Sequence, residues 1–425
     1  MTVSNNRSRF VKTLSAASAL ALGAVVLTGC APATTAGGCE LGAEQSGDLT
    51  LKLGSALPLT GNLAFLGPPE EAGAYLAVDE INAAGKGITI DYTPGDSGDT
   101  DNKAYDTEIP RLLNAGVEAV VGAASSGVSL QFIDRLTAEC VIHFSPANTS
   151  AAFTDYEDKG LYFRTAPSDV LQGEVLGNLL AADGHETVAM IVINDAYGTG
   201  LRDNATLAFE AAGGSVVATP SYNVGDTNFT SQINEMLAED PDAIVVLAFD
   251  ETKTIVPALI DAGFSNSGLY FTDGNLADYS ADFEAGLIEG SKGTLPGPPA
   301  DTISDDYKER AQALWTENGG DELTSWAYST ESYDAVVLLA LAALAAGSTE
   351  PADMAAKMSE VSGFSGGGTK CGTFAECAEI INGGGVADYD GLSGGIALNE
   401  AGDPTETAIG IYEFDADNRP QTYQG

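Results

Sequence analysis

The sequence predicts an α/β fold made of two doubly wound lobes, each with a parallel β-sheet at its centre. Short β-type runs alternate with helix-length segments, which is the pattern of βαβ units. The same alternation starts again after residues 161–164. The chain has 425 residues, more than one hydrophobic core usually serves, so two domains are expected.

The expected elements follow the chain in order. In the first lobe, strands are predicted at residues 49–57, 88–92, 119–121 and 141–144, and helices at 68–84, 103–114 and 128–138. In the second lobe, strands are predicted at residues 188–193, 216–222, 243–248 and 269–271, each beside a helix-length segment. The apolar run 336–346 is too short to span a membrane and is expected to be a buried helix. The glycine runs 366–368 and 383–385 lack the following Lys-Ser or Lys-Thr of a phosphate-binding loop, so we interpret them as turns and predict no nucleotide site.

The N-terminus has the pattern of a secretory signal. Arg7, Arg9 and Lys12 precede an apolar run at residues 14–26. The run is shorter than the roughly 20 residues of a membrane span, which argues against an uncleaved anchor. The Leu-Thr-Gly-Cys that follows at 27–30 resembles a bacterial lipobox. We therefore expect a signal peptide at 1–29, a lipid on Cys30, a flexible tether over 30–47, and an extracytoplasmic protein anchored to the cell membrane.

Four cysteines remain beside the lipidated one, an even number in a compartment where disulfides persist. Cys371 and Cys377 bracket a short loop and are expected to pair with each other, which leaves Cys39 for Cys140. Zinc binding is the alternative, but no second closely spaced Cys or His pair completes a tetrahedral site. The sequence thus predicts two disulfides and no metal.

The charge balance excludes some partners. The chain carries 18 Lys plus Arg against 61 Asp plus Glu, a formal net charge of −43. Such a surface repels nucleic acid and anionic lipid heads. The acids are scattered and 44% of the residues are hydrophobic, so the protein is expected to be globular rather than an acidic disordered chain.

Polar residues follow the predicted strands of both lobes. In parallel sheets ligands bind outside the carboxyl ends of the strands. Ser126 and Thr149, near the N-terminus of a predicted helix, offer hydroxyls and backbone N–H groups for an anion. Asp273, at a strand end of the second lobe, offers a carboxylate for a cation. An anion site facing a cation site fits an α-amino acid, whereas helix capping and turn chemistry explain each residue taken alone.

Several motifs together resemble the Leu/Ile/Val-binding branch of the type I periplasmic binding proteins. The resemblance runs from about residue 49 to residue 414. It rests on Ser-Ala-Leu-Pro-Leu-Thr-Gly at 55–61, Val-Gly-Ala-Ala-Ser-Ser at 121–126, Phe-Ser-Pro-Ala-Asn-Thr-Ser at 144–150, Phe-Arg-Thr-Ala-Pro-Ser-Asp at 163–169 and Asp-Ala-Tyr-Gly-Thr-Gly-Leu at 195–201.

The resemblance implies roles for the polar residues. The ligand α-carboxylate would be held by the Ser126 hydroxyl, the Ala147 backbone and Thr149. The ligand ammonium would meet Asp273, where relatives often carry Glu. Since Asp is one methylene shorter, the ligand or the lobes must shift, or a water must bridge.

The resemblance also implies a pocket wall. Tyr197 matches the aromatic residue of the family's Tyr-Gly turn, and Phe249 lies where another aromatic is common. Leu66, beside Phe65, occupies a position that is aromatic in the best-known members. This departure alters the pocket wall and leaves open which ligand side chain the pocket prefers.

The architecture implied by the resemblance is a hinge of three crossings around an interlobe cleft. The crossings are expected near residues 165–168, 294–297 and 399–405. The expected lobes are residues 48–167 with 297–405, and residues 168–296 with 406–425. A monomer without cofactor would then close on a small ligand and deliver it to an ABC permease and its ATPase.

Other functions remain as alternatives. A ligand sensor for a signalling receptor needs the same closing cleft, and amides, urea or carboxylic acids fit similar folds. A hydrolase is disfavoured because neither His143 nor His185 belongs to a Ser/His/Asp series and no Gly-x-Ser-x-Gly elbow occurs. The acidic run 96–101 resembles a calcium loop only in part, since Lys103 and Ala104 depart from the EF-hand pattern, and a turn that caps a helix is preferred.

Overall fold

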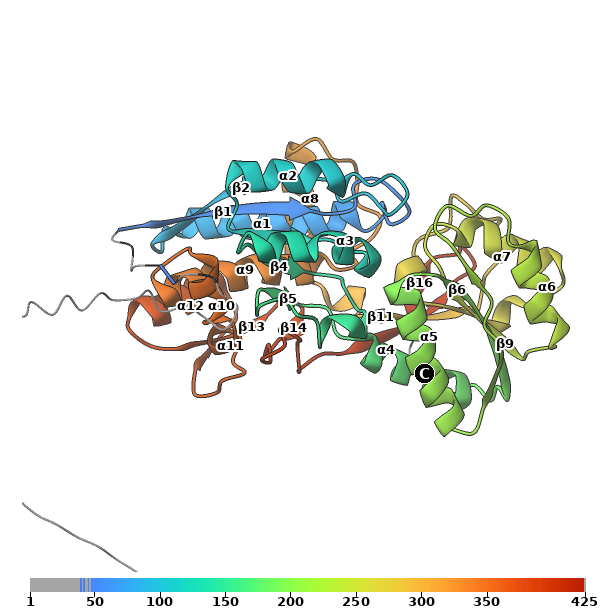
Figure 1. Ribbon diagram of the computed structural model, residues 1–425. Coiled ribbons are helices and arrows are strands. Elements are labelled where there is room, and N and C mark those ends of the chain that lie inside the picture. Colours follow the sequence, from blue (N-terminus) through green and yellow to red (C-terminus); the bar gives the residue numbers. More distant parts are fainter. Residues whose placement is uncertain (1–38, 40, 43–44, 46, 424–425) are drawn as a thin grey trace, which may run out of the picture. The chain divides into compact units, whose positions relative to one another are not determined.

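The computed structural model describes residue 39, residues 41 and 42, residue 45 and residues 47–423. The expected signal peptide and the lipid-bearing Cys30 lie outside the described residues. The described part contains two parallel-sheet lobes, which confirms the predicted fold class (Figure 1).

The first lobe is built on a five-stranded sheet in the order β2-β1-β3-β4-β5, in which all neighbours are parallel. Its strands are β1 (Leu49–Ala56), β2 (Ile88–Thr93), β3 (Ala119–Gly122), β4 (Ile142–Ser145) and β5 (Tyr162–Arg164). The first four lie within one residue of the predicted strands, and β5 was not predicted. The order 2-1-3-4-5 is that of a doubly wound sheet.

Both faces of this sheet are covered by helices, because successive strand residues point to opposite faces. Leu49, Leu51 and Leu53 pack toward α1 (Gly67–Ala84) and α9 (Ser329–Ala346). Val120 packs on the other face, toward α2 (Tyr105–Ala115) and α3 (Ser126–Ala138). Helix α8 (Asp305–Glu317) lies against α1.

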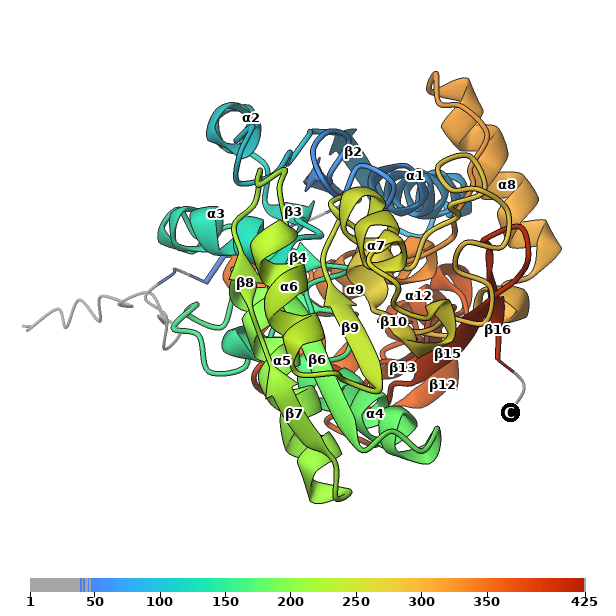
Figure 2. The ribbon, with the colours of Figure 1, turned by 90° about the vertical axis from the view of Figure 1, so that its right-hand side faces the viewer.

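The second lobe is built on an eight-stranded sheet in the order β16-β15-β11-β10-β9-β6-β7, with β8 also paired to β6. Its strands are β6 (Thr187–Ile193), β7 (Ser215–Ala218), β8 (Ser221–Tyr222), β9 (Ala243–Leu247), β10 (Leu269–Phe271), β11 (Lys292–Pro296), β15 (Ile409–Phe414) and β16 (Pro420–Thr422). The sheet packs against α4 (Asp169–Ala182), α5 (Ala196–Ala211), α6 (Thr230–Ala238) and α7 (Thr252–Asp261) (Figure 2).

The predicted strand at 216–222 is wrong as a single element. It is divided into β7 and β8, and Pro220 lies between them. Proline has no N–H to donate to the ladder, so pairing with β6 is interrupted there. The antiparallel strands β15 and β16 at the sheet edge were not anticipated from the sequence.

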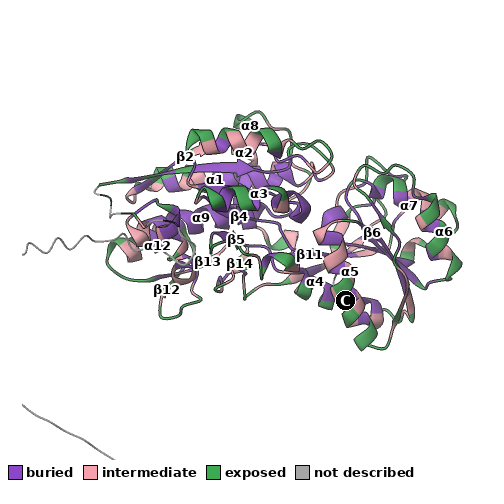
Figure 3. Ribbon diagram, in the orientation of Figure 1, coloured by how far each residue is buried: buried purple, intermediate pink, exposed green. Residues whose placement is uncertain are grey.

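The longest apolar helix is α9, which contains the predicted buried run 336–346. It is the one helix in the described part of the chain that is long and apolar enough to cross a membrane, yet 83% of its apolar window is buried within the protein (Figure 3). Packing against α1 and the first sheet accounts for its apolar surface. It is therefore a core helix, as predicted.

The first lobe carries an extension after α9. It consists of the helices α10 (Pro351–Ala355), α11 (Met358–Val361) and α12 (Phe374–Asn382) and the strands β12 (Thr369–Cys371), β13 (Ala387–Gly391) and β14 (Gly394–Gly395). The structure contains both expected disulfides, Cys371–Cys377 within this extension and Cys39–Cys140. Two further contacts hold the chain just after Cys39: the Gly42 N–H donates to Asp353, and the Gln45 N–H donates to the Gly347 carbonyl. These residues therefore belong to the folded part rather than to a free tether.

Candidate functional site

A small cavity lies where the strand ends of the two sheets face each other. The space free of protein atoms is small and narrow here, about 250 Å³ including the solvent at its mouth. Nearly all of its lining comes from segments that follow the carboxyl ends of β1, β3, β4, β6, β9 and β10. The lining residues are Leu63, Leu66, Ala124, Ser125, Ser126, Ala147, Thr149, Tyr197, Phe249, Asp273, Gly274 and Tyr328.

The first lobe presents hydrogen-bond donors to this cavity. Ser125 caps α3, its hydroxyl accepting the Val128 N–H at 3.3 Å. The Ser126 hydroxyl accepts the Ser150 N–H at 3.2 Å, and its own proton remains available for a ligand. With the α3 N-terminus beside them, Ser126 and Thr149 can hold an anion.

The second lobe presents a buried carboxylate. Asp273 is 5% exposed and lies in a short 3₁₀ helix, Asp273–Asn275, directly after β10. Its Oδ1 accepts hydrogen bonds from the Tyr197 hydroxyl at 2.8 Å and the Gln172 amide at 2.9 Å, and its Oδ2 accepts one from the Tyr328 hydroxyl at 2.8 Å. Burial raises the pKa of Asp273, and these hydrogen bonds oppose the rise. One acceptor position on Oδ2 stays open to a donor from a ligand.

More acceptors without matched donors lie beside Asp273. Asp169, the first residue of α4, is fully buried, and neither of its carboxylate oxygens receives a well-aligned hydrogen bond from a described residue. Burial and the nearby charge of Asp273 raise the pKa of Asp169, whereas the Thr149 hydroxyl lowers it. The Gln172 side-chain oxygen, one turn along α4, is also buried without a donor among the described residues. Neither Asp169 nor Gln172 lines the cavity, so Asp273 is the acid that faces it.

The remaining wall is apolar and aromatic. Leu63 and Leu66 come from the loop after β1 and are buried. The Tyr197 and Phe249 rings stack with 5.6 Å between their centroids. Tyr328 completes the wall from the segment before α9. No Lys or Arg lines the cavity among the described residues, so its walls suit an uncharged side chain.

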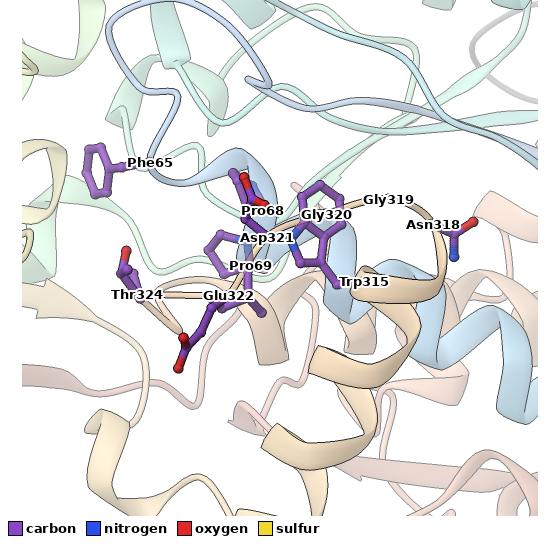
Figure 4. A pocket seen from close by; sticks show the side chains of 12 residues that line it. Phe65, Pro68, Pro69, Trp315, Asn318, Gly319, Gly320, Asp321, Glu322 and Thr324 are labelled. Carbon is purple, nitrogen blue, oxygen red and sulfur yellow. The ribbon is translucent and has the colours of Figure 1, made fainter.

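Phe65 does not line this cavity, which corrects the expectation from the sequence. Its ring lies at a separate, more open pocket of about 720 Å³ together with Pro68, Pro69 and Trp315 (Figure 4). The chain turns into α1 at this point, and of the two adjacent side chains Leu66 faces the cavity while Phe65 faces the neighbouring pocket. The other seven predicted ligand residues all line the cavity.

Two polar residues that line the cavity were missed, Ser125 and Tyr328. Ser125 directly precedes Ser126 after β3, so the same strand end was a signal that could have been used. Tyr328 follows no strand end, and it adopts a left-handed conformation with φ of +58°. Asp169, a buried neighbour of Asp273 that does not line the cavity, was not predicted either.

A buried ion pair fixes the loop that carries Ala147 and Thr149. Arg164 is fully buried and donates to the Asp403 carboxylate at 2.6 Å. It also donates to the backbone oxygens of Asn148 and Ser150. The loop after β4 is thereby held against the segment that contains Asp403.

Neither histidine is placed for catalysis. His143 is fully buried between Phe132 and Tyr162, and burial lowers its pKa to about 3. His185 Nε2 lies 2.8 Å from the Tyr270 hydroxyl, and His185 does not line the cavity. Within the described ranges no group of three or more His, Cys, Asp or Glu side chains is arranged to hold a metal ion.

The acidic run at 96–101 has a structural role. Asp96 accepts the N–H groups of Leu59 and Thr60, and Asp99 accepts that of Asn62. These carboxylates therefore fix the loop after β1 on the first lobe.

Comparisons with known proteins agree on the family. A family model described as periplasmic binding protein matches residues 50–392. A chemotactic signal transduction system substrate-binding protein of Halobacterium salinarum is 24% identical over 363 residues, which cover 83% of this chain and 84% of that protein. A Leu/Ile/Val-binding protein homologue of Brucella suis is 28% identical over 319 residues, covering 73% of this chain and 83% of that protein. A leucine-binding protein of Thermotoga maritima has the same fold, with a TM-score of 0.71 at 20% identity over 88% of this chain and 97% of that one.

Proposed function

Because the chain belongs to the periplasmic binding protein family, we propose that it captures a branched-chain or related amino acid outside the cytoplasmic membrane and delivers it to an ABC importer. The relatives that it matches are binding proteins rather than enzymes, as expected.

The observation that carries it is the pairing of Asp273 with the hydroxyls of the other lobe. A ligand ammonium would take the open position on Asp273 Oδ2, and its charge would offset the repulsion between Asp273 and Asp169. A ligand carboxylate would meet Ser126 and Thr149 at the α3 N-terminus. Its uncharged side chain would lie against Leu63, Leu66 and the aromatic rings.

Closure follows from this arrangement. A ligand stabilises the closed form only if it contacts both lobes better there than in the open form. A zwitterion held by Ser126 on one side and Asp273 on the other meets that condition. The proposed hinge consists of the crossings at residues 165–168, 294–297 and 399–405.

The family is extracytoplasmic, and we propose that the signal at 1–29 is removed and that Cys30 carries a lipid in the outer leaflet of the cell membrane. Mass spectrometry of the mature N-terminus tests the modification.

Replacing Asp273 by Asn tests the ammonium site. Asn keeps an oxygen for Tyr197 and Gln172 but removes the negative charge, so the dissociation constant for L-leucine is expected to rise roughly 10- to 100-fold. The melting temperature of the free protein should change little. Titration calorimetry with L-leucine, L-isoleucine and L-valine measures the affinity.

The exposed Asp261, at the end of α7, provides the matched control as Asp261→Asn. Unchanged leucine affinity in Asp273→Asn would contradict the role of Asp273. Binding of amides or carboxylic acids that lack an ammonium, with no amino acid bound, would keep the binding-protein fold and overturn the amino-acid assignment.

A sensing role is the second candidate, favoured by the Halobacterium salinarum relative, which is named for chemotactic signal transduction. The same closed form would then be recognised by a membrane receptor. Genes for a permease and an ATPase beside this gene would support transport, whereas a receptor gene in their place would support sensing.

A further inference from the structure

We propose that Asn62 and Glu251 act as a clamp that holds the two lobes closed over the ligand and so set how slowly it leaves. The inference rests on the proposed function, because it assumes a ligand bound between the lobes. Asn62 lies in the loop after β1 of the first lobe, and Glu251 follows β9 of the second lobe.

The clamp has two direct contacts between the lobes. The Asn62 side-chain amide donates to Glu251 Oε1 at 2.6 Å. The backbone N–H of Asp250 donates to the Asn62 carbonyl oxygen at 3.2 Å. A side-chain contact and a backbone contact at the same residue fix both the distance and the orientation of the two loops.

Each partner is fixed on its own lobe before it reaches across. Glu251 uses its other oxygen, Oε2, to accept the Phe249 N–H at 3.2 Å and the Tyr222 hydroxyl at 3.5 Å. On the first lobe, the Asn62 N–H donates to Asp99 at 3.0 Å. Because the Glu251 side chain is already held by its own lobe, little of its entropy is lost when the clamp forms.

The clamp is coupled to the cavity through neighbouring residues. Leu63, the residue after Asn62, lines the cavity from the first lobe, and Phe249, two residues before Glu251, lines it from the second. The clamp forms only when these two walls approach each other. It does not itself line the cavity, so it is a positioning pair and should not select among ligands.

The charged surroundings make the contact sensitive to substitution. Burial raises the pKa of Glu251, and the charge of Asp250 raises it further. Asn62 supplies a neutral donor in this acidic environment, with Asp99 behind it. A carboxylate in place of the Asn62 amide would face Glu251 directly and repel it.

Two substitutions of Asn62 test the clamp. Asn62→Ala is expected to raise the dissociation constant for L-leucine roughly tenfold, and Asn62→Asp further still. The increase should appear in the dissociation rate, measured by stopped-flow fluorescence, with the association rate nearly unchanged. The ratio of leucine to valine affinity should stay that of the wild type. Asn223→Ala is the matched control, since Asn223 accepts an exposed hydrogen bond from Asn194 within the second lobe.

Wild-type affinity in both Asn62 variants, or a changed ratio of leucine to valine affinity, would overturn the clamp. Absence of amino-acid binding by the wild type would instead overturn the proposed function. The clamp then remains testable with the amide or carboxylic acid that the wild type does bind, where Asn62→Asp should release it faster than the wild type and an equal dissociation rate would overturn the clamp.

Discussion

The Asp273 carboxylate accepts hydrogen bonds from three side chains. Two of these donors belong to the second lobe and one belongs to the first. Tyr197 and Gln172 lie on α5 and α4 of the second lobe, whereas Tyr328 precedes α9. The Tyr328 hydroxyl therefore links the two lobes beside the cavity. It also stabilises the charged form of Asp273, which is the form that an ammonium needs.

Tyr328→Phe should weaken leucine binding roughly tenfold, because it removes one hydrogen bond to the carboxylate. The difference in leucine affinity between Tyr328→Phe and the wild type should grow toward acid pH. Losing a donor raises the pKa of Asp273 further, so the fall in affinity on acidification should begin at a higher pH than in the wild type. Calorimetry between pH 4 and 8 measures both effects. Tyr156→Phe, which removes a Tyr–Asp hydrogen bond far from the cavity, should match the wild type, and an unshifted acid limb in Tyr328→Phe would refute the role.

At the scale of elements, α1 and α9 bury acidic residues in their first turns. Glu70 is fully buried and neither of its oxygens has a hydrogen-bond partner among the described residues. Glu331 on α9 is 2% exposed, and its charge raises the pKa of Glu70 after the larger effect of burial. Burial raises the pKa of Glu331 itself to about 8. The helix pair is therefore stable with protonated acids between the two helices.

This arrangement predicts how stability depends on pH. In the unfolded chain Glu331 titrates near 4.5, so between about pH 4.5 and 8 the folded state binds the additional proton. The contribution of Glu331 to the free energy of unfolding is thus complete below pH 4.5 and is lost as the pH rises through 8, by up to about 1.4 kcal/mol per pH unit. Glu331→Gln should flatten this decline in urea unfolding at pH 5, 7 and 8.5. The exposed Glu317→Gln serves as control, and parallel profiles for Glu331→Gln and the wild type would contradict the prediction.

The elements also show what the sequence could and could not predict. The runs that became β1, β3 and β10 are apolar and bounded by turn residues, so periodicity located them closely. β12 and β14 are only three and two residues long, too short to carry such a signal. The strand ends predicted Ser126, Thr149 and Asp273 because parallel strands share one edge, and the family resemblance supplied the other four predicted residues that line the cavity. Tyr328 reaches the cavity only through the packing of α9 against α1, which no local pattern encodes.

At the scale of the molecule, the charge is the feature that the site does not explain. The 61 acidic residues outnumber the 18 basic ones, and many of the ion pairs involve half-exposed side chains. Exposed pairs contribute at most about 1 kcal/mol each. Repulsion among the unpaired acids therefore opposes the compact state.

Raising the salt concentration should stabilise this protein. The screening length falls from about 10 Å at 0.1 M salt to about 3 Å at 1 M, which weakens repulsion between scattered acids more than it weakens close pairs. The melting temperature is expected to rise by roughly 5 °C between 0.05 and 0.5 M sodium chloride. Differential scanning calorimetry at pH 7 measures the change. Screening saturates once the charges are shielded, whereas exclusion of salt from the surface grows steadily with concentration. A rise that levels off below 1 M sodium chloride thus identifies repulsion as the cause, and a melting temperature that is flat or falls with salt would show that the acids are not destabilising.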